Sequence, residues 1–342
     1  MIEAHTLDAW TRAASRSAPA YSYAVMAAGF AAPLFLWLAG LAIPLAAVSS
    51  VRRGLSRRAA AEKVCCRGLE IFILAFLFRL QAFVLSPGAH PVTLFRVDIL
   101  NVLGPSMVAT GLVWLLTPST TSLVVGYSAL ATAFTMVTPL VRTAAFVSKL
   151  PTWVQWYVRP AADNTTFTGF PWMGFAFAGA AVGVLIAAVG ESARRRLFVA
   201  LGIAGGALVA LGCFAASLPS IYADSSFWTT SPTYFAIRLG AMMAALPLMY
   251  FVERMLSNRW FPATALARLG RHSLFVYWIH VELVYGYASW SLHRRLPLWG
   301  TAVAYIAFTA FIYAAVVLRD RVADAWRRRQ SQISFQYKVE TV

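Results

Sequence analysis

The stretch 266-LARLGRHSLFVYWIHVELVYGYASW-290 opens with basic residues and continues as an apolar, aromatic run about as long as a bilayer is thick. Two ionisable residues, His280 and Glu282, lie inside the run. An ionisable group near the middle of a membrane helix costs roughly 2.5–3.5 kcal/mol, so it normally faces a polar interior and has a partner. Residues two apart point in different directions on a helix, so we expect each to find its partner on another helix.

His280 shares one stripe of that predicted helix with Tyr277. Such a stripe fits two interpretations, a buried structural histidine or a binding site that uses both side chains. Glu282 is closer to the far end of the run, where a structural or interfacial role is favoured over a chemical one.

The rest of the chain has the same apolar character. Of its 342 residues, 60% are hydrophobic and 12% are charged, which is typical of a polytopic membrane protein and not of a soluble domain. The apolar runs are continuous, which favours an all-α fold over a β-barrel. We predict a transmembrane helical bundle of about nine membrane helices. The expected runs are 21–48, 69–86, 96–116, 122–140, 170–190, 197–218, 234–252, 266–290 and 299–318.

The net charge of +16 lies mainly in short loops, so membrane topology explains it better than nucleic-acid binding does. The loops after the first, fifth and seventh runs and the tail after the ninth are the basic ones. By the positive-inside rule they face the cytoplasm, in a multi-pass protein of the plasma or inner membrane with a cytoplasmic C-terminus. We therefore predict an outer-face segment at 1–20, a transmembrane domain at 21–318 and a cytoplasmic basic tail at 319–342.

This orientation makes the first run cross from outside to inside. Residues 1–20 contain two acids and no apolar core, so they do not resemble a signal peptide. We expect that a preceding membrane helix is missing from the chain.

Charged residues inside the second and third runs predict a buried ion pair. Arg79 and Asp98 lie on helices that a short loop joins into an antiparallel hairpin. Asn101 should share a face with Asp98, and Arg96 should lie at the outer rim. A purely structural ion pair and a site role remain open for this group.

A second candidate lies near the start of the chain, where His5 and Asp8 are three residues apart. On a helix the two would be neighbours, and the carboxylate could orient the imidazole for proton transfer. The five histidines are too scattered for metal-ligand spacing, so we expect no metal. The spacings Gly179–Gly183 and Gly202–Gly206 predict close packing of helices.

Five segments, taken in order, carry a family likeness: MIEAHTLDAW (1–10), FAAPLFLWLAG (30–40), RRGLSRRAAAEKVCCRGLE (52–70), RVDILNVLG (96–104) and LGRHSLFVYWIH (269–280). The chain resembles the membrane acyltransferase family of heparan-α-glucosaminide N-acetyltransferase and its bacterial relatives. The likeness covers 1–116 and about 264–290. The family's first helix, with an acidic residue and an Arg-Gly pair, has no counterpart here.

The resemblance implies transfer of an acetyl group from cytosolic acetyl-CoA to a sugar amine or hydroxyl on the outer face. His5 matches the catalytic histidine, acting either as a general base or through an acetyl-histidine. Asp8, Asp98 and Asn101 complete the expected catalytic group, with Asn101 as an oxyanion donor. The expected binding residues are Arg79, Arg96, Arg271, His272, Tyr277 and His280, and Arg57 and Arg58 are also available for the CoA phosphates.

Two other interpretations remain. Intramembrane Arg, Asp and His also mark the substrate paths of transporters, although the chain shows no inverted repeat. A structural membrane protein without chemistry would tolerate the joint removal of Arg79 and Asp98.

Overall fold

The computed structural model describes residues 1–85, 90–161, 165–255 and 261–340, without the side chains of 85, 261–263 and 331–340. Helices and isolated bridges make up its regular structure, and the all-α class is confirmed. The last two residues of the predicted tail at 319–342 lie outside the described residues.

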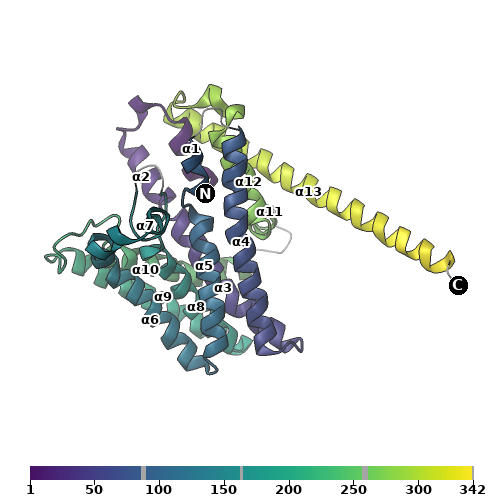
Figure 1. Cartoon of the computed structure of the whole chain (residues 1–342), viewed down its shortest axis with the longest axis horizontal. Coiled ribbons are helices and arrows are strands. Elements are labelled where there is room, and N and C mark those ends of the chain that lie inside the picture. Colours follow the sequence, from purple (N-terminus) through teal and green to yellow (C-terminus); the bar gives the residue numbers. More distant parts are fainter. Residues whose placement is uncertain (86–89, 162–164, 256–260, 341–342) are drawn as a thin grey trace. The chain divides into compact units, whose positions relative to one another are not determined.

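The chain forms two compact units, which are described separately. Unit 1 comprises Met1–Gly29 and Met255–Val342, and unit 2 comprises Phe30–Arg254. Unit 1 contains α1 (Ile2–Trp10), η1 (Ala13–Ser15), α2 (Pro19–Ala28), α11 (Phe261–Arg271), α12 (Ser273–Tyr285), η5 (Tyr287–Leu292) and α13 (Leu298–Glu340) (Figure 1). Unit 2 contains α3 (Ala31–Arg52), α4 (Arg57–Leu85), η2 (Pro91–Phe95), α5 (Ile99–Leu116), α6 (Thr120–Thr143), η3 (Ala145–Lys149), α7 (Thr152–Val158), α8 (Gly169–Ala188), α9 (Glu191–Ala216) and α10 (Pro232–Met255).

Seven helices among the described residues are long and apolar enough to cross a membrane, and the expected count of nine is not confirmed. They are Pro19–Arg52, Ile99–Leu116, Thr120–Thr143, Gly169–Ala188, Glu191–Ala216, Pro232–Met255 and Leu298–Gln330. The expected run at 266–290 breaks at His272, whose backbone is not helical. The 13 residues of α12 span only about 20 Å, less than the thickness of a bilayer core. The other expected run that is absent from the seven, 69–86, lies mostly in α4.

The centre of unit 2 is α8, which packs against α3 and α6. Small side chains fill most of this helix, and its residues from Gly174 to Val184 are buried. A Cβ added at Gly179 or Gly183 would collide with carbonyl groups of α3, and one added at Gly40 would collide with Ala176 of α8. The expected close packing at 179 and 183 is confirmed, and we call this contact the α3–α8 glycine seam. The second spacing behaves differently, since Gly202 meets Pro247 of α10 while Gly206 has nothing within 4 Å.

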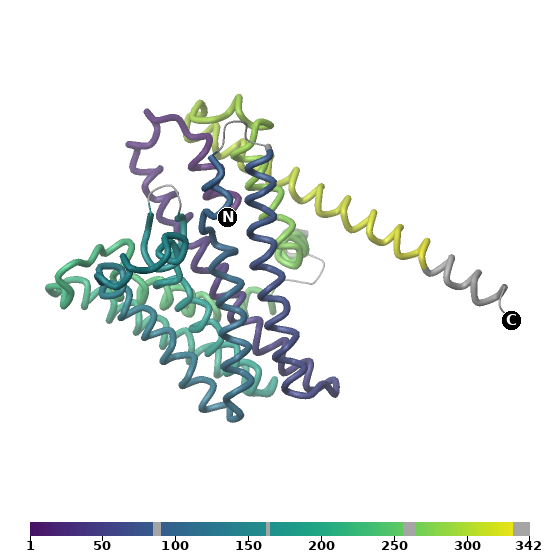
Figure 2. The backbone as a smooth tube through the Cα atoms, viewed as in Figure 1, coloured from purple at the N-terminus to yellow at the C-terminus, as the bar shows by residue number. Residues whose placement is uncertain are grey.

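Helices α4 and α5 lie side by side in unit 2, as the tube in Figure 2 shows. Gly68 and Gly104 mark their closest approach, because a Cβ on either would press on the other residue's carbonyl oxygen. The two helices form the hairpin expected from the short connection between them, and it brings Arg79 beside Asp98.

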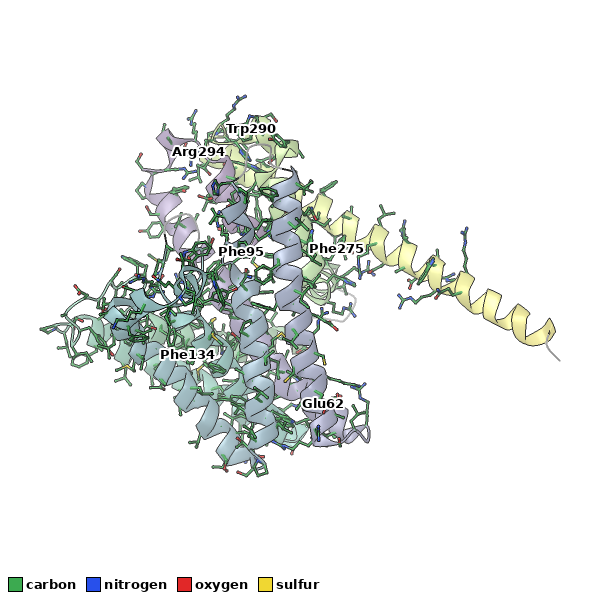
Figure 3. The ribbon with its side chains drawn as sticks, in the orientation of Figure 1. Glu62, Phe95, Phe134, Phe275, Trp290 and Arg294 are labelled. Atoms are coloured by element: carbon green, nitrogen blue, oxygen red, sulfur yellow. The ribbon has the colours of Figure 1, made fainter. Side chains whose placement is uncertain are left out.

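In unit 1, α1 packs on α12 and α13. Ala9 and Trp10 form an apolar cluster with Val284, and Phe308 of α13 covers that cluster. The end of α1 is also tied to the segment after η5, because Arg294 N donates to Ala9 O (2.9 Å) and Leu296 N donates to Trp10 O (3.0 Å). Figure 3 labels Arg294 in this segment, together with Trp290 of η5 and Phe275 of α12. The short helix α1 therefore has a fixed position on the two helices beneath it.

Candidate functional site

The polar cluster of unit 1 is centred on His5, in the middle turn of α1. Its Nδ1 lies 3.1 Å from the hydroxyl oxygen of Tyr285, the last residue of α12. The same hydroxyl donates to Asp8 Oδ2 at 2.9 Å. Three side chains from two helices thus form one hydrogen-bonded chain, which we call the Asp8–Tyr285–His5 relay.

The relay fixes the tautomer of His5. A phenol has one proton, and Tyr285 gives that proton to the carboxylate of Asp8. Its oxygen can therefore only accept from His5, so the neutral imidazole carries its proton on Nδ1. The other ring nitrogen, Nε2, then holds a lone pair, which is the state that a general base requires.

Asp8 has a second partner that holds it in place. Arg16 Nη1 lies 3.9 Å from Asp8 Oδ1, and Arg16 also donates to the backbone oxygen of Asp8. The Nε of Arg16 donates to Thr11 O at 3.1 Å. Because these contacts involve Oδ1 and the backbone, Oδ2 stays available to Tyr285.

Burial and, to a smaller extent, the charge of the terminal amine lower the pKa of His5 to about 4, while Asp8 opposes the change. A buried cation loses its hydration, so burial favours the neutral imidazole. His5 is therefore neutral at physiological pH and ready to accept a proton.

His280 lies beside His5, with ring centroids 5.2 Å apart. It is fully buried, and its Nδ1 lies 2.5 Å from the carbonyl oxygen of Val276. Its hydrogen-bond acceptor is thus one turn earlier on α12, whereas its neighbour on another helix, as expected, is the ring of His5 on α1. Tyr277 is also buried, and its ring centroid is 5.9 Å from that of His280.

The residue that the sequence did not single out is Tyr285. We expected Asp8 to orient His5 as its direct neighbour on α1, but the carboxylate acts through the Tyr285 hydroxyl. The only signal in the sequence was a tyrosine at the end of the apolar run, in a stretch rich in aromatic residues. Its contact with α1 joins residues 280 positions apart.

The end of α12 is fixed through one backbone carbonyl. Val284 O accepts from Trp10 Nε1 (3.3 Å), Ser289 Oγ (2.7 Å) and His293 Nε2 (2.8 Å). Three donors from α1, η5 and the segment beyond it meet at this oxygen, one residue before Tyr285. This arrangement positions the Tyr285 hydroxyl over α1.

At the other end of α12, His272 belongs to a charged cluster with α13. Its Nε2 lies 3.1 Å from Asp320 Oδ1, and Arg319 Nη1 lies 2.8 Å from its Nδ1. Since guanidinium only donates, Nδ1 accepts and the proton lies on Nε2. Arg268 also approaches Asp320, at 3.8 Å, and Arg271 is exposed. Of the two expected phosphate-binding residues here, Arg271 has the more accessible charge.

Unit 2 holds the second polar group. Arg79 and Asp98 form the expected ion pair, and their side chains are 15% and 12% exposed. Asp98 precedes α5 as its N-cap residue instead of lying on the helix face, and its backbone N–H donates to Asn101 Oδ1 at 3.0 Å. This is one half of a capping box. The pair therefore fixes the start of α5, with Asp98 near the positive end of the helix.

Asn101 is fully buried, and its Nδ2 makes no hydrogen bond of normal geometry with the described residues. The Asn101 side chain also interacts with the hydroxyl of Tyr157 of α7; burial raises the pKa of Tyr157, and this interaction opposes that rise. An amide with free N–H groups is a potential donor to an oxygen of a ligand. This geometry is compatible with the expected oxyanion donor.

Three other expected binding residues make structural contacts. Arg96 Nη2 donates to Thr166 Oγ1 (3.0 Å), next to the bridge between Val97 and Thr165. Arg57 donates to the carbonyl oxygens of Trp114 and Thr117 at the end of α5, with its guanidinium 4.4 Å from the Trp114 ring. Arg58 pairs with Glu62 at 2.9 Å on the exposed face of α4. Arg57 therefore caps a helix, which competes with phosphate binding.

Among the residues that the structure describes, no group of three or more His, Cys, Asp or Glu side chains is placed to hold a metal ion.

The seven apolar helices and the buried polar groups define a multi-pass integral membrane protein with a hydrogen-bonded histidine on a short helix. A family comparison identifies the class more closely. The sequence model named "Heparan-alpha-glucosaminide N-acetyltransferase, catalytic" matches residues 1–214, and the chain belongs to that family. A comparison with curated proteins found no match. Family membership implies a membrane-bound acyltransferase, and the family's donor is acetyl-CoA.

The match contains His5, Asp8, Arg79, Arg96, Asp98 and Asn101. The likeness expected over 264–290 lies beyond the matched residues, as do Tyr285 and His280. The structure connects the two parts, because the matched His5 depends on Tyr285 for its orientation.

Proposed function

We propose that this protein transfers an acetyl group from cytosolic acetyl-CoA to a sugar amine or hydroxyl on the outer face of the membrane. The observation that carries the proposal is the Asp8–Tyr285–His5 relay, in a chain of the N-acetyltransferase catalytic family. A base whose second nitrogen is oriented by a third group is the arrangement that activates a nucleophile, and here a carboxylate acts on that nitrogen through a hydroxyl. His5 is the base, Tyr285 orients it, and Asp8 orients Tyr285.

In this mechanism the acceptor is an amine or hydroxyl, X–H. His5 Nε2 removes its proton while X attacks the thioester carbonyl carbon, and the imidazole becomes an imidazolium. When the carbon–sulfur bond breaks, the sulfur of CoA takes that proton from His5. Such general base and acid catalysis contributes about 10²–10⁴ in rate. The histidine ends neutral, and the relay retains its hydrogen bonds throughout.

We further propose that Asn101 of unit 2 donates from Nδ2 to a carbonyl oxygen of a bound substrate. Its buried amide, whose Nδ2 has no hydrogen bond of normal geometry among the described residues, supports this role. The Arg79–Asp98 pair would hold the start of α5, and so Asn101, in position. Preorganised donors of this kind stabilise charge that develops on an oxygen.

For the donor, we propose that Arg271 binds a phosphate of CoA from the cytoplasmic side. The exposed guanidinium of Arg271 supports this role, and guanidinium pairs well with phosphate. The associated orientation places 1–20 outside the membrane and 319–342 in the cytoplasm, following the distribution of basic residues. His272, Tyr277, His280 and Arg96 are proposed to border the path of the substrates.

The test uses the purified full chain in lipid nanodiscs with labelled acetyl-CoA and glucosamine as the acceptor. His5→Ala should abolish acetyl transfer while expression and Tm stay unchanged, and His90→Ala, at an exposed histidine, should retain transfer. Turnover that persists in His5→Ala would rule out His5 as the base. In proteoliposomes, movement of intact acetyl-CoA without an acetylated product would favour a transporter.

A second measurement concerns the donor alone. Arg271→Glu should weaken acetyl-CoA binding in calorimetry, whereas the same charge reversal at the exposed Arg295, on the predicted outer side, should not. Equal binding by both variants would contradict the proposed phosphate contact.

A further inference from the structure

His280 has a buried nitrogen whose role the mechanism above does not explain. The neighbouring Val276 oxygen accepts from Nδ1, so in the neutral ring the proton lies on Nδ1. The remaining nitrogen, Nε2, is therefore an acceptor without a donor. It is buried and has no hydrogen-bond partner among the described residues. A buried acceptor that stays unpaired costs free energy, so this lone pair is expected to have a partner in some state of the protein.

The side chain that could become the partner of His280 Nε2 is His5. The two ring centroids are 5.2 Å apart and the rings are tilted by 46°. No hydrogen bond joins the two rings in this structure, but at that centroid separation two ring nitrogens turned toward each other would lie about 2.9 Å apart. Both imidazoles are neutral with their protons on Nδ1, so at rest neither Nε2 can donate to the other.

That situation changes when His5 removes the acceptor's proton. His5 then carries N–H groups on both nitrogens, and Nδ1–H already donates to Tyr285. Until the sulfur of CoA takes this proton, the new Nε2–H needs an acceptor, and the buried lone pair of His280 is available. A hydrogen bond to an ionised group is about twice as strong as one between neutral groups.

We propose that His280 is a positioning residue for proton transfer, whose Nε2 accepts a hydrogen bond from the Nε2–H of protonated His5. The inference rests on the proposed role of His5 as the base. In this role His280 acts through His5 and not on the reacting atoms, and it stabilises the imidazolium until CoA takes the proton. No proton is gained or lost by His280 in this step, because it only accepts the hydrogen bond.

Few other charges of unit 1 compete with this contact. On α1 the groups that act on His5 are Asp8 and the terminal amine, with Arg16 beyond Asp8. On α12 they are Tyr285 and His280, with Tyr277 against His280. From α13 the residues packed against α1 and α12 include the apolar Phe308 and Ile312.

Two substitutions separate the acceptor role from a structural role. In His280→Asn the amide nitrogen takes the place of Nδ1, so the bond to Val276 O is kept while the distal acceptor is lost. In His280→Gln the longer side chain brings an amide oxygen to the position of Nε2. A structural role predicts that Asn is the better tolerated variant, and the proposal predicts the reverse.

The primary readout is the titration of His5 in nanodiscs, followed by NMR on protein with labelled histidine. Loss of the acceptor should lower the pKa of His5 by about one to two pH units in His280→Asn, with a value near wild type in His280→Gln. In the wild-type protein, the Nε2 resonance of His280 should shift as His5 titrates, which needs no variant to fold. Equal His5 pKa values in the three proteins, or a His280 Nε2 resonance that ignores the titration of His5, would overturn the proposal.

Kinetics then connect this contact to turnover. In the glucosamine assay His280→Asn should lower kcat about 10- to 100-fold at unchanged KM, and the acid limb of its pH profile should move to lower pH. An unchanged kcat would overturn the proposal. Acetyl transfer by a His5→Ala protein would instead contradict the proposed function. The NMR measurement would still test the His5–His280 contact independently of that result.

Discussion

Tyr285→Phe removes one oxygen atom and tests the relay directly. That oxygen accepts from His5 Nδ1 and donates to Asp8, so the variant loses both hydrogen bonds at once. A hydrogen bond to a carboxylate contributes about 1.5–3 kcal/mol. Tyr285 is 41% exposed, and water replaces part of this contribution, so we take about 1.5–2 kcal/mol. The expected loss in kcat/KM is about 10- to 30-fold.

The assay is acetyl transfer from labelled acetyl-CoA to glucosamine, with full pH profiles of kcat/KM. Phe keeps the ring and its packing, so Tm should change by no more than a few degrees. Tyr287→Phe is the matched control, because it makes the same change two residues later in η5 at a 63% exposed side chain. Wild-type kcat/KM in a folded Tyr285→Phe protein would refute the relay.

Three further predictions concern stability. The pKa of His5 is about 4 in the folded protein and 6.5 in the unfolded chain, so the unfolded chain binds more protons between those pH values. The Tm should therefore fall as the pH is lowered from 6.5 to about 4, and His5→Gln should make that fall smaller. A His5→Gln protein with the wild-type pH dependence of Tm would contradict this assignment. Gly179→Val should disrupt the α3–α8 glycine seam and lower Tm strongly, whereas Gly206→Val should leave Tm nearly unchanged, because nothing lies within 4 Å of that site. Similar Tm values for the two variants would contradict the close packing at the seam. Asp98→Asn should lower the free energy of unfolding of unit 2 by about 3–5 kcal/mol, because it leaves the mostly buried charge of Arg79 without its counter-ion. Replacing Asp98 and Arg79 together by Leu and Met should lower it less. Both are measured by denaturation in detergent, and a single variant more stable than the double one would refute the argument.

The contacts that could be predicted from the sequence are those between neighbours in the chain. Arg79 and Asp98 follow from two apolar runs and a short connection, which allow only an antiparallel hairpin. The glycines at 179 and 183 follow from their spacing on one helix face. Both inferences need only helical geometry and a membrane.

The contacts that could not be predicted depend on long-range packing. Tyr285 reaches His5 because three donors converge on Val284 O and fix the end of α12, and no periodicity encodes that convergence. The break at His272 was hidden for a related reason. The run from 266 to 290 has the composition of one membrane helix, and only the backbone angles at His272 divide it into α11 and α12.

The α3–α8 glycine seam has a consequence for how the sequence can vary. Where main chains touch, any side chain heavier than hydrogen strikes a carbonyl, so Gly40, Gly179 and Gly183 admit no gradual substitution. A larger residue at one of them would require the opposing helix to move away. No single substitution on that helix can compensate, because the colliding atoms belong to its backbone. These sites should therefore resist random mutagenesis as strongly as a catalytic residue does, although they perform no chemistry.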